Sequence, residues 1–277
     1  MAEASYCAAL VRRVDYDRYL AALFAPAAAR ERLFALFAFN HEIAKVRETV
    51  TEPMIGQIRL QWWREAIDGI YAGAPRKHAV VDALAQAVGA GKPARLDFEA
   101  LIDSREFDLA GKAPESLAEL EVYAEASSAR LLYLAAALLG AGGEATRAAL
   151  RPLGIAWSLV GLIRAIPFHA RARRQFIPAD IANAAGLTEE ALFAAKGDEP
   201  LKRAVAALAA AALRHLAAAQ SAAPEPAARP LMLFAPLARG YLRRLEARGH
   251  DVAGRPVDMA PASKILRLWW AARTGAG

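Results

Sequence analysis

The side chains best suited to take part in chemistry lie at the end of an otherwise apolar segment, residues 33–48. The last turns of this segment carry His41, Lys45 and Glu48. A carboxylate such as Glu48 is the hard oxygen ligand that magnesium prefers. It is also the kind of charge that ordinarily faces solvent at a helix end. The segment therefore predicts a buried helix with a polar end, and leaves a metal ligand and a plain surface charge both open for Glu48.

A second apolar segment, residues 153–166, ends in a similar way. Arg164 lies near its end, and His169 follows just beyond Pro167. His169 could act as a general base or metal ligand, or could cap or hydrogen-bond the chain where Pro167 interrupts the helix. Three arginines that come next could meet an anionic headgroup or a diphosphate, or could form a solvated basic face; they are Arg171, Arg173 and Arg174.

The composition limits the classes of protein to consider. The 277 residues are 56% hydrophobic with mean hydropathy +0.17, which is ample for a substantial core. The single cysteine, Cys7, excludes an intrachain disulfide and a cysteine-based metal cluster, and fits a reducing compartment. A net charge of +6 permits weak attraction to anionic lipid, but no nucleic-acid motif is present. We expect a cytoplasmic protein, at most peripheral at the inner face of a membrane, with no nucleic-acid partner.

Helical periodicity, punctuated by glycine and proline, runs along the whole chain. The predicted helices cover residues 5–13, 27–48, 53–72, 78–88, 95–109, 116–140, 145–166, 188–195, 201–219, 231–248 and 262–272. We expect an irregular polar piece at residues 15–19 and an extended one at 176–178. The apolar runs 131–141 and 153–163 are too short to span a membrane. Because no strand alternation or repeat stands out, we predict one all-α domain over residues 1–277.

Several stretches, in order along nearly the whole chain, carry a family likeness. They are Tyr6-Cys7, residues 33–48, Gln61-Trp62-Trp63-Arg64-Glu65 with Ile70-Tyr71-Ala72-Gly73, and residues 156–178 ending in Arg174-Gln175-Phe176-Ile177-Pro178. Together they resemble the squalene/phytoene synthase family of head-to-head prenyl diphosphate transferases. A narrower likeness, in residues 37–40, 55–61 and 123–134, is to the divergent branch that contains a mitochondrial complex I assembly factor. The resemblance implies an isoprenoid-synthase-type antiparallel helical bundle around a central apolar cavity.

The chemistry of that family depends on two aspartate pairs, each spaced four residues apart on a helix, which hold magnesium and the substrate diphosphate. At the matching positions this sequence has Ala44, Lys45 and Glu48 in the first motif, and Ala165 and His169 in the second. Alanine cannot ligate a metal, and a lysine ammonium repels one. We therefore expect no catalytic residue, metal site or cofactor here; magnesium would bind only if the chain is an active enzyme with altered ligands.

The resemblance also implies where a substrate would bind. It places Phe37, His41, Arg164 and Phe176 at substrate-binding positions. Arg164 matches an arginine of the family, whereas His41 replaces an arginine and Phe176 replaces a tyrosine. Compared with the family, this sequence thus keeps the apolar framework of the fold but has different residue types at the positions that would face phosphate.

Asp15 and Asp17 stand where the family positions diphosphate with small hydroxyl residues. A carboxylate about 4 Å from a phosphate oxygen repels it by roughly 4 kcal/mol at an effective dielectric constant near 20. Together with Arg18, the two aspartates could form an ion-pair lock that replaces the substrate site. An exposed polar loop is the alternative.

Two further groups of side chains have competing interpretations. Trp62 and Trp63 could line an isoprenoid cavity, although at least one is expected to pack in the core. The carboxylates of residues 103, 106 and 108 are expected to form a charged helix face rather than a metal site; they are Asp103, Glu106 and Asp108.

Three functions remain open at this point. The first is a bundle without diphosphate chemistry that holds a prenyl lipid or a partner protein, as the likeness to the complex I assembly factor implies. The second is an active head-to-head prenyltransferase with rearranged metal ligands. The third is a peripheral membrane adaptor that uses the basic surface with Trp269 and Trp270, which could otherwise dock the last helix onto the body.

Overall fold

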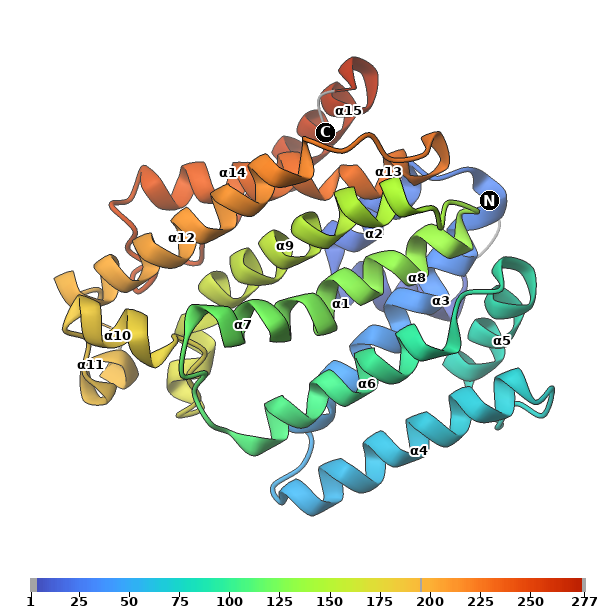
Figure 1. The fold of residues 1–277 in the computed structure, drawn as a ribbon, viewed down its shortest axis with the longest axis horizontal. Helices are drawn as coiled ribbons and strands as arrows, with labels where there is room; N and C mark the ends of the chain where they lie inside the picture. The colour runs from blue at the N-terminus through green and yellow to red at the C-terminus, as the bar shows by residue number, and fades with distance from the viewer. Residues whose placement is uncertain (1–3, 195, 276–277) are drawn as a thin grey trace.

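The computed structural model describes residues 4–194 and 196–275, and every regular element within these ranges is helical (Figure 1). The first part of the chain forms α1 (Tyr6–Val14), α2 (Tyr16–Leu23), α3 (Ala27–Ala44), the 3-10 turn η1 (Lys45–Glu48), α4 (Pro53–Tyr71), α5 (Ala79–Gly91) and α6 (Arg95–Ala110). In Figure 1, α4 lies at one edge of the bundle. The predicted all-α class is confirmed.

The second part of the chain completes the bundle. Its elements are α7 (Leu117–Ala124), the π-helical segment η2 (Glu125–Ala129), α8 (Arg130–Leu138), α9 (Glu144–Arg171), α10 (Ala179–Ala185), α11 (Glu189–Ala194), α12 (Glu199–Ala219), the 3-10 turn η3 (Pro226–Ala228), α13 (Arg229–Met232), α14 (Phe234–Glu246) and α15 (Pro261–Thr274). Residue 195, the last of a predicted helix, lies outside the described ranges. In Figure 1, α15 lies at the edge of the molecule opposite α4.

Local signals in the sequence set several helix starts. Pro53 occupies the first turn of α4, where its missing N–H costs nothing. Ser116 caps α7 by accepting a 3.3 Å hydrogen bond from the backbone N–H of Glu119. The Glu119 carboxylate accepts from the backbone N–H of Glu115, one residue before the cap, so the two bonds form a capping box that is shifted by one position.

Several of the predicted elements differ from the structure. Residues 15–19 are not irregular, because Asp15 accepts a 3.0 Å hydrogen bond from the backbone N–H of Arg18 and thereby caps α2. Helix α9 continues past Pro152 and Pro167 to Arg171. The helix predicted over 231–248 is divided into α13 and α14, and the one over 116–140 contains the π-helical segment.

Helix α9 runs through the middle of the bundle and positions much of the interior. It packs along α12 on one side and against the π-helical segment on the other. At this second contact the backbones come very close, because a Cβ added to Gly154 would lie 2.4 Å from the Cα atom of Ala129. Gly154 therefore lets the π-helical segment lie directly against α9, which brings Ser127 and Ser128 to the interior of the bundle.

By length and composition, α9 is the one helix in the described residues that could cross a membrane. Its most apolar window of 18 residues has a mean hydropathy of 1.4, and 56% of that window is buried inside the bundle. The apolar run at 153–163 is short, as expected, but the helix that contains it is much longer. Burial of this kind is typical of a core helix that packs against neighbours on several sides.

Candidate functional site

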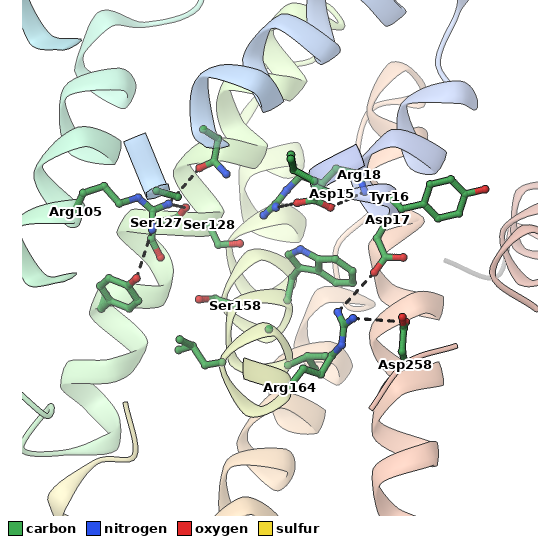
Figure 2. Close-up of a pocket in the computed structure, with 18 of the residues that line it drawn as sticks. Asp15, Tyr16, Asp17, Arg18, Arg105, Ser127, Ser128, Ser158, Arg164 and Asp258 are labelled. Atoms are coloured by element: carbon green, nitrogen blue, oxygen red, sulfur yellow. Dashed lines mark hydrogen bonds and ion pairs between the residues drawn. The ribbon is translucent and has the colours of Figure 1, made fainter. Parts of the chain in front are cut away.

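A cavity of about 510 Å³ opens between α1, α2, α3, α6, the π-helical segment, α9 and α15. We call it the central cavity. Its polar lining residues are Arg13, Asp15, Tyr16, Asp17, Arg18, Asn40, Arg105, Tyr123, Ser127, Ser128, Ser158, Arg164, Asp258 and Lys264, many of which Figure 2 shows. The expectation of an apolar cavity is therefore wrong for this space, because charged and hydroxyl side chains make up most of its wall.

The buried carboxylate of Asp17 organises one wall of the central cavity. Its Oδ1 lies 2.9 Å from Nζ of Lys264, and its Oδ2 lies 3.6 Å from a terminal nitrogen of Arg164. The hydroxyl of Tyr241 donates a hydrogen bond to Oδ2. Asp258 closes the group at 2.9 Å from Lys264 and 3.6 Å from Arg164. We call these five residues the Asp17 cluster; Figure 2 shows Arg164 reaching between its two aspartates.

The charges of the Asp17 cluster balance one another. Burial works to raise the pKa of Asp258, but Lys264, the backbone N–H of Met259 and Arg164 outweigh it and lower that pKa. Burial above all raises the pKa of Tyr241, so its hydroxyl stays protonated and serves as a donor. The guanidinium of Arg164 lies 3.8 Å from the centre of the Tyr241 ring and donates to the carbonyl of Val257 at 2.9 Å. Two cations and two carboxylates thus satisfy each other within the protein.

A second buried polar group, the Arg105 cluster, lines the opposite wall. One terminal nitrogen of Arg105, Nη2, donates to the side-chain oxygen of Asn40 at 3.2 Å and to the Ser127 carbonyl at 3.4 Å. The hydroxyl of Tyr123 donates to Asp108 at 2.8 Å, and Arg105 pairs with that carboxylate at 3.5 Å. Burial raises the pKa of Tyr123 and the negative charge of Asp108 adds to this effect. The expected charged face is thus wrong for Asp108, which is buried with a partner on each side.

The other carboxylates of α6 behave as expected for a surface. Asp103 and Glu106 both accept from Arg64 of α4 at 2.6 Å and are more than half exposed. Asp15 also forms an ion pair, with Arg18, at the rim of the central cavity. Of the expected lock of Asp15, Asp17 and Arg18, the pair of Asp15 with Arg18 is present, whereas Asp17 has its partners in distant parts of the chain.

The residues at the magnesium positions do not fit a metal ion. Ala44 lines the central cavity and offers no ligand atom, and Ala165 is equally without one. Lys45 is paired with Glu42 at 2.6 Å, and Glu48 is exposed and does not line the cavity. Among the residues that the structure describes, no group of three histidine, cysteine or acidic side chains could hold a metal ion. We therefore derive no step through magnesium.

His169 packs among aromatic rings instead of capping the chain. Its ring lies 4.6 Å from that of Phe176 and 5.8 Å from that of Phe168, and its Nδ1 atom is buried without a hydrogen-bond partner. Burial, followed by the nearby charge of Arg174, lowers the pKa of His169 to about 4. The imidazole is therefore neutral near pH 7 and does not line the central cavity.

The predicted substrate-binding residues separate into two groups. Arg164 lines the central cavity, whereas Phe37 and Phe176 are buried in the hydrophobic core. His41 is half-buried at the end of α3, where burial and then Lys45 lower its pKa. Only Arg164 of these four residues is placed to touch a ligand in this cavity.

The tryptophans of α4 pack away from the central cavity. Trp63 is buried and makes an edge contact with Phe39, the ring centres lying 5.4 Å apart. Trp62 is half-buried and contacts Trp63 and His78. Core packing is confirmed for Trp63, and neither residue lines the space in which Arg164 lies.

Sequence reasoning missed both Arg105 and Lys264 as residues of the site. A usable signal was present, since Arg105 shares a helical face with Leu101, Ile102 and Leu109, all of which are buried. Lys264 likewise lies in register with Leu268, which is buried on the inner side of α15. A charged residue in the apolar register of a helix indicates a buried partner.

With the fold and the cavity described, the chain can be compared with known proteins. Residues 11–264 match the family model described as squalene/phytoene synthase. The chain belongs to the squalene/phytoene synthase family. A dehydrosqualene synthase solved in complex with ligand superposes with a TM-score of 0.85 at 16% identity, covering 98% of this chain and 95% of that one. That likeness confirms the isoprenoid-synthase-type bundle.

Two kinds of relative stand out within the squalene/phytoene synthase family. The bovine protein named NADH dehydrogenase (ubiquinone) complex I, assembly factor 6 is 33% identical over 271 residues, covering 95% of this chain and 81% of that protein. Presqualene diphosphate synthase of Sinorhizobium fredii is 27% identical over 257 residues, covering 91% of each chain. The family thus includes relatives with an assembly name and relatives with an enzyme name.

Proposed function

We propose that this chain is an assembly-type binding protein that keeps the prenyl-transfer scaffold without its diphosphate chemistry. The observation that carries the proposal is the Asp17 cluster. Arg164 and Lys264, the cations available to hold an anion at this wall, are already held by Asp17 and Asp258. The chain supplies its own anion where the family resemblance implies a diphosphate.

Electrostatics opposes a diphosphate at this wall. A phosphate oxygen about 4 Å from the Asp17 carboxylate would be repelled by roughly 4 kcal/mol at an effective dielectric constant near 20. To bind there, it would also have to separate Lys264 from two carboxylates, each 2.9 Å away. With alanine at positions 44 and 165, no pair of carboxylates is available to bring in a compensating metal ion.

The similar proteins also support an assembly-type function. A chain 33% identical over nearly its whole length carries the name of a complex I assembly factor, whereas the presqualene diphosphate synthase is 27% identical. We propose that this chain likewise acts through a protein partner, a respiratory complex subunit being the class suggested by the relative's name. The central cavity is the place for a small ligand, and its polar wall favours a lipid headgroup over a bare prenyl chain.

A second candidate function is head-to-head prenyl transfer with altered ligands. The presqualene diphosphate synthase relative and the retained Arg164 at the cavity wall favour it. It requires the Asp17 cluster to open and a metal to bind without the carboxylates of either motif. This candidate therefore stands second.

A turnover assay distinguishes the two candidate functions. Purified full-length protein is incubated with farnesyl diphosphate and magnesium chloride, and the extracted products are analysed by gas chromatography and mass spectrometry, with the Sinorhizobium fredii enzyme as positive control. We expect no product above a no-protein blank. Formation of presqualene diphosphate or dehydrosqualene, abolished by Glu48→Ala, would overturn the proposal in favour of the enzyme.

A further inference from the structure

The last helix carries a row of large apolar side chains on its outer side. Ile265, Leu266, Trp269 and Trp270 of α15 are exposed, with Leu266 at 67% and Trp270 at 64%. The residues of α15 that face the bundle are Lys264, Leu268 and Ala271, all of them buried. Their spacing places the two sets on opposite sides of the helix. We call the four exposed residues the α15 face.

Such a surface is unusual on a protein that stays in water. Two neighbouring tryptophans beside a leucine and an isoleucine make a contiguous apolar patch, which marks an interaction site rather than scattered surface residues. The 14 residues of α15 reach about 21 Å, which is too short to span a bilayer but long enough to lie along one. The α15 face follows residues 11–264, the segment that the family model matches.

Positive charge surrounds the α15 face. Between Pro261 and Gly275 there is no acidic residue, while Arg267 and Arg273 flank the apolar row. The Nε atom of Arg267 lies 2.9 Å from the position of a Cβ added to Gly240, so this guanidinium lies against α14, which also carries Arg243 and Arg244. Burial and then the like charges of those two arginines lower the pKa of Arg267. We call the four arginines the basic rim.

Helix α15 is held so that this face stays turned outward. Lys264 on its inner side is bound to Asp17 and Asp258 at 2.9 Å, and Leu268 is fully buried. In Figure 1, α15 lies at the edge of the bundle, remote from α4. The apolar row is therefore presented on a fixed element rather than on a loose tail.

We infer that the α15 face docks on an anionic lipid surface, with the tryptophans in the headgroup region and the basic rim against the lipid phosphates. Tryptophan prefers the boundary between headgroups and acyl chains, and each basic residue near an anionic surface adds to the attraction. A second copy of this chain fits less well, because a symmetric contact would bring the basic rim against itself. Membrane docking goes beyond the proposed assembly function and does not depend on it.

Cosedimentation with vesicles tests the inference on the full-length protein. One set of vesicles is phosphatidylcholine alone, and the other contains about one third phosphatidylglycerol. We expect binding to the anionic vesicles and little to the neutral ones, with a blue shift of tryptophan emission on binding. Replacing both tryptophans (Trp269→Ser with Trp270→Ser) should lower the partition coefficient at least about tenfold, since each buries a large apolar ring.

Two control variants make the result specific. Met54→Ser with Ile58→Ser removes two exposed apolar residues from α4 at the other edge, and should leave binding unchanged. Arg243→Gln with Arg244→Gln should weaken binding to anionic vesicles by about fivefold for each charge and flatten its salt dependence. Circular dichroism melting confirms that each variant is folded.

Either of two results would overturn the inference. Equal binding by the wild type and by the folded tryptophan variant would show that the α15 face does not meet the lipid. Absence of binding to both kinds of vesicle would show that the α15 face does not dock on lipid, and would favour a protein partner.

Discussion

The two walls of the central cavity hold buried polar clusters that differ in reach and in charge. The Asp17 cluster joins α2, α9, α14 and α15 through two cations and two carboxylates. The Arg105 cluster joins α3, α6 and the segment around Tyr123 and Ser127, with one ion pair and several neutral groups. The Asp17 cluster therefore balances charge across the site, whereas the Arg105 cluster links neighbouring helices.

Under the proposed function, the wall that carries the Asp17 cluster is the part of the scaffold that has changed. The Asp17 cluster includes Arg164, the residue that resembles a family substrate position, and closes it with internal carboxylates. The Arg105 cluster contains no residue that the family resemblance assigns to metal or diphosphate. We therefore interpret the Arg105 cluster as structural and the Asp17 cluster as the replacement for a lost ligand.

The largest effect should come from breaking the structural cluster. Arg105→Met leaves the Asp108 carboxylate buried with only the Tyr123 hydroxyl as partner. We expect a loss of about 3–5 kcal/mol in the free energy of unfolding, measured by urea denaturation. The double variant Arg105→Met with Asp108→Leu should recover part of this loss, because no unpaired charge remains. A loss below about 1 kcal/mol would show that Arg105 is dispensable for folding.

Breaking the Asp17 cluster should cost less. After Lys264→Met, Asp17 keeps the Tyr241 hydroxyl and Arg164, so we expect a loss of about 2–3 kcal/mol by the same measurement. Lys202→Met is the matched control, since Lys202 pairs only with the exposed Glu199 and should leave the denaturation midpoint unchanged. Equal effects of the two substitutions would contradict the special role of the cluster.

The buried imidazole of His169, which lies outside both clusters, makes the free energy of unfolding depend on pH. His169 has a pKa of about 4 in the fold against an ordinary value of 6.5. As pH falls from 6.5 towards 4, the unfolded chain binds the proton first, so stability is lost across this window and no further loss from His169 occurs below it. Between pH 7 and pH 5 we expect His169 to contribute about 2 kcal/mol of that loss, and His169→Phe to remove it. Identical pH profiles for wild type and variant would show that this histidine is not the cause.

The smallest effect is expected at the last carboxylate of the first motif. Glu48 is exposed at the end of η1, so Glu48→Ala should change the free energy of unfolding by less than about 0.5 kcal/mol. It should also leave the melting temperature unresponsive to magnesium, as in the wild type. A magnesium-dependent rise in the melting temperature of the wild type that Glu48→Ala removes would restore the metal-ligand interpretation.

The helical fold follows from local signals in the sequence. Pro53 at the start of α4 and the Ser116 cap of α7 each act within a few residues. The helix predicted over residues 27–48 is confirmed as far as Ala44, after which Lys45–Glu48 forms a 3-10 turn. The boundary error near Asp15 comes from a local signal, the Asp15 cap on the backbone N–H of Arg18, whereas α9 continues past Pro167 because the helix is packed against its neighbours. Local propensity alone does not decide such boundaries.

The site could be predicted only in part. The family resemblance assigned Ala44 and Arg164 to the metal and substrate positions of two helices, and both residues line the central cavity. The partners of Asp17 could not be found in this way, since Tyr241 lies 224 residues further along the chain and no short spacing links them. Likewise, the burial of Arg105 depends on Asn40 and Ser127 of other elements, which a single helical pattern does not reveal.

Calorimetric titration with inorganic diphosphate, with and without magnesium, tests the central claim most directly. Because Asp17 holds Arg164 and Lys264, we expect no binding heat for the wild type in either condition. The variant Asp17→Ser removes one of the two carboxylates that hold Arg164 and Lys264 and puts a hydroxyl in its place, and it should gain metal-independent affinity for diphosphate. Magnesium-dependent binding by the wild type, or no gain in the folded Asp17→Ser variant, would contradict the claim that this carboxylate replaces the ligand.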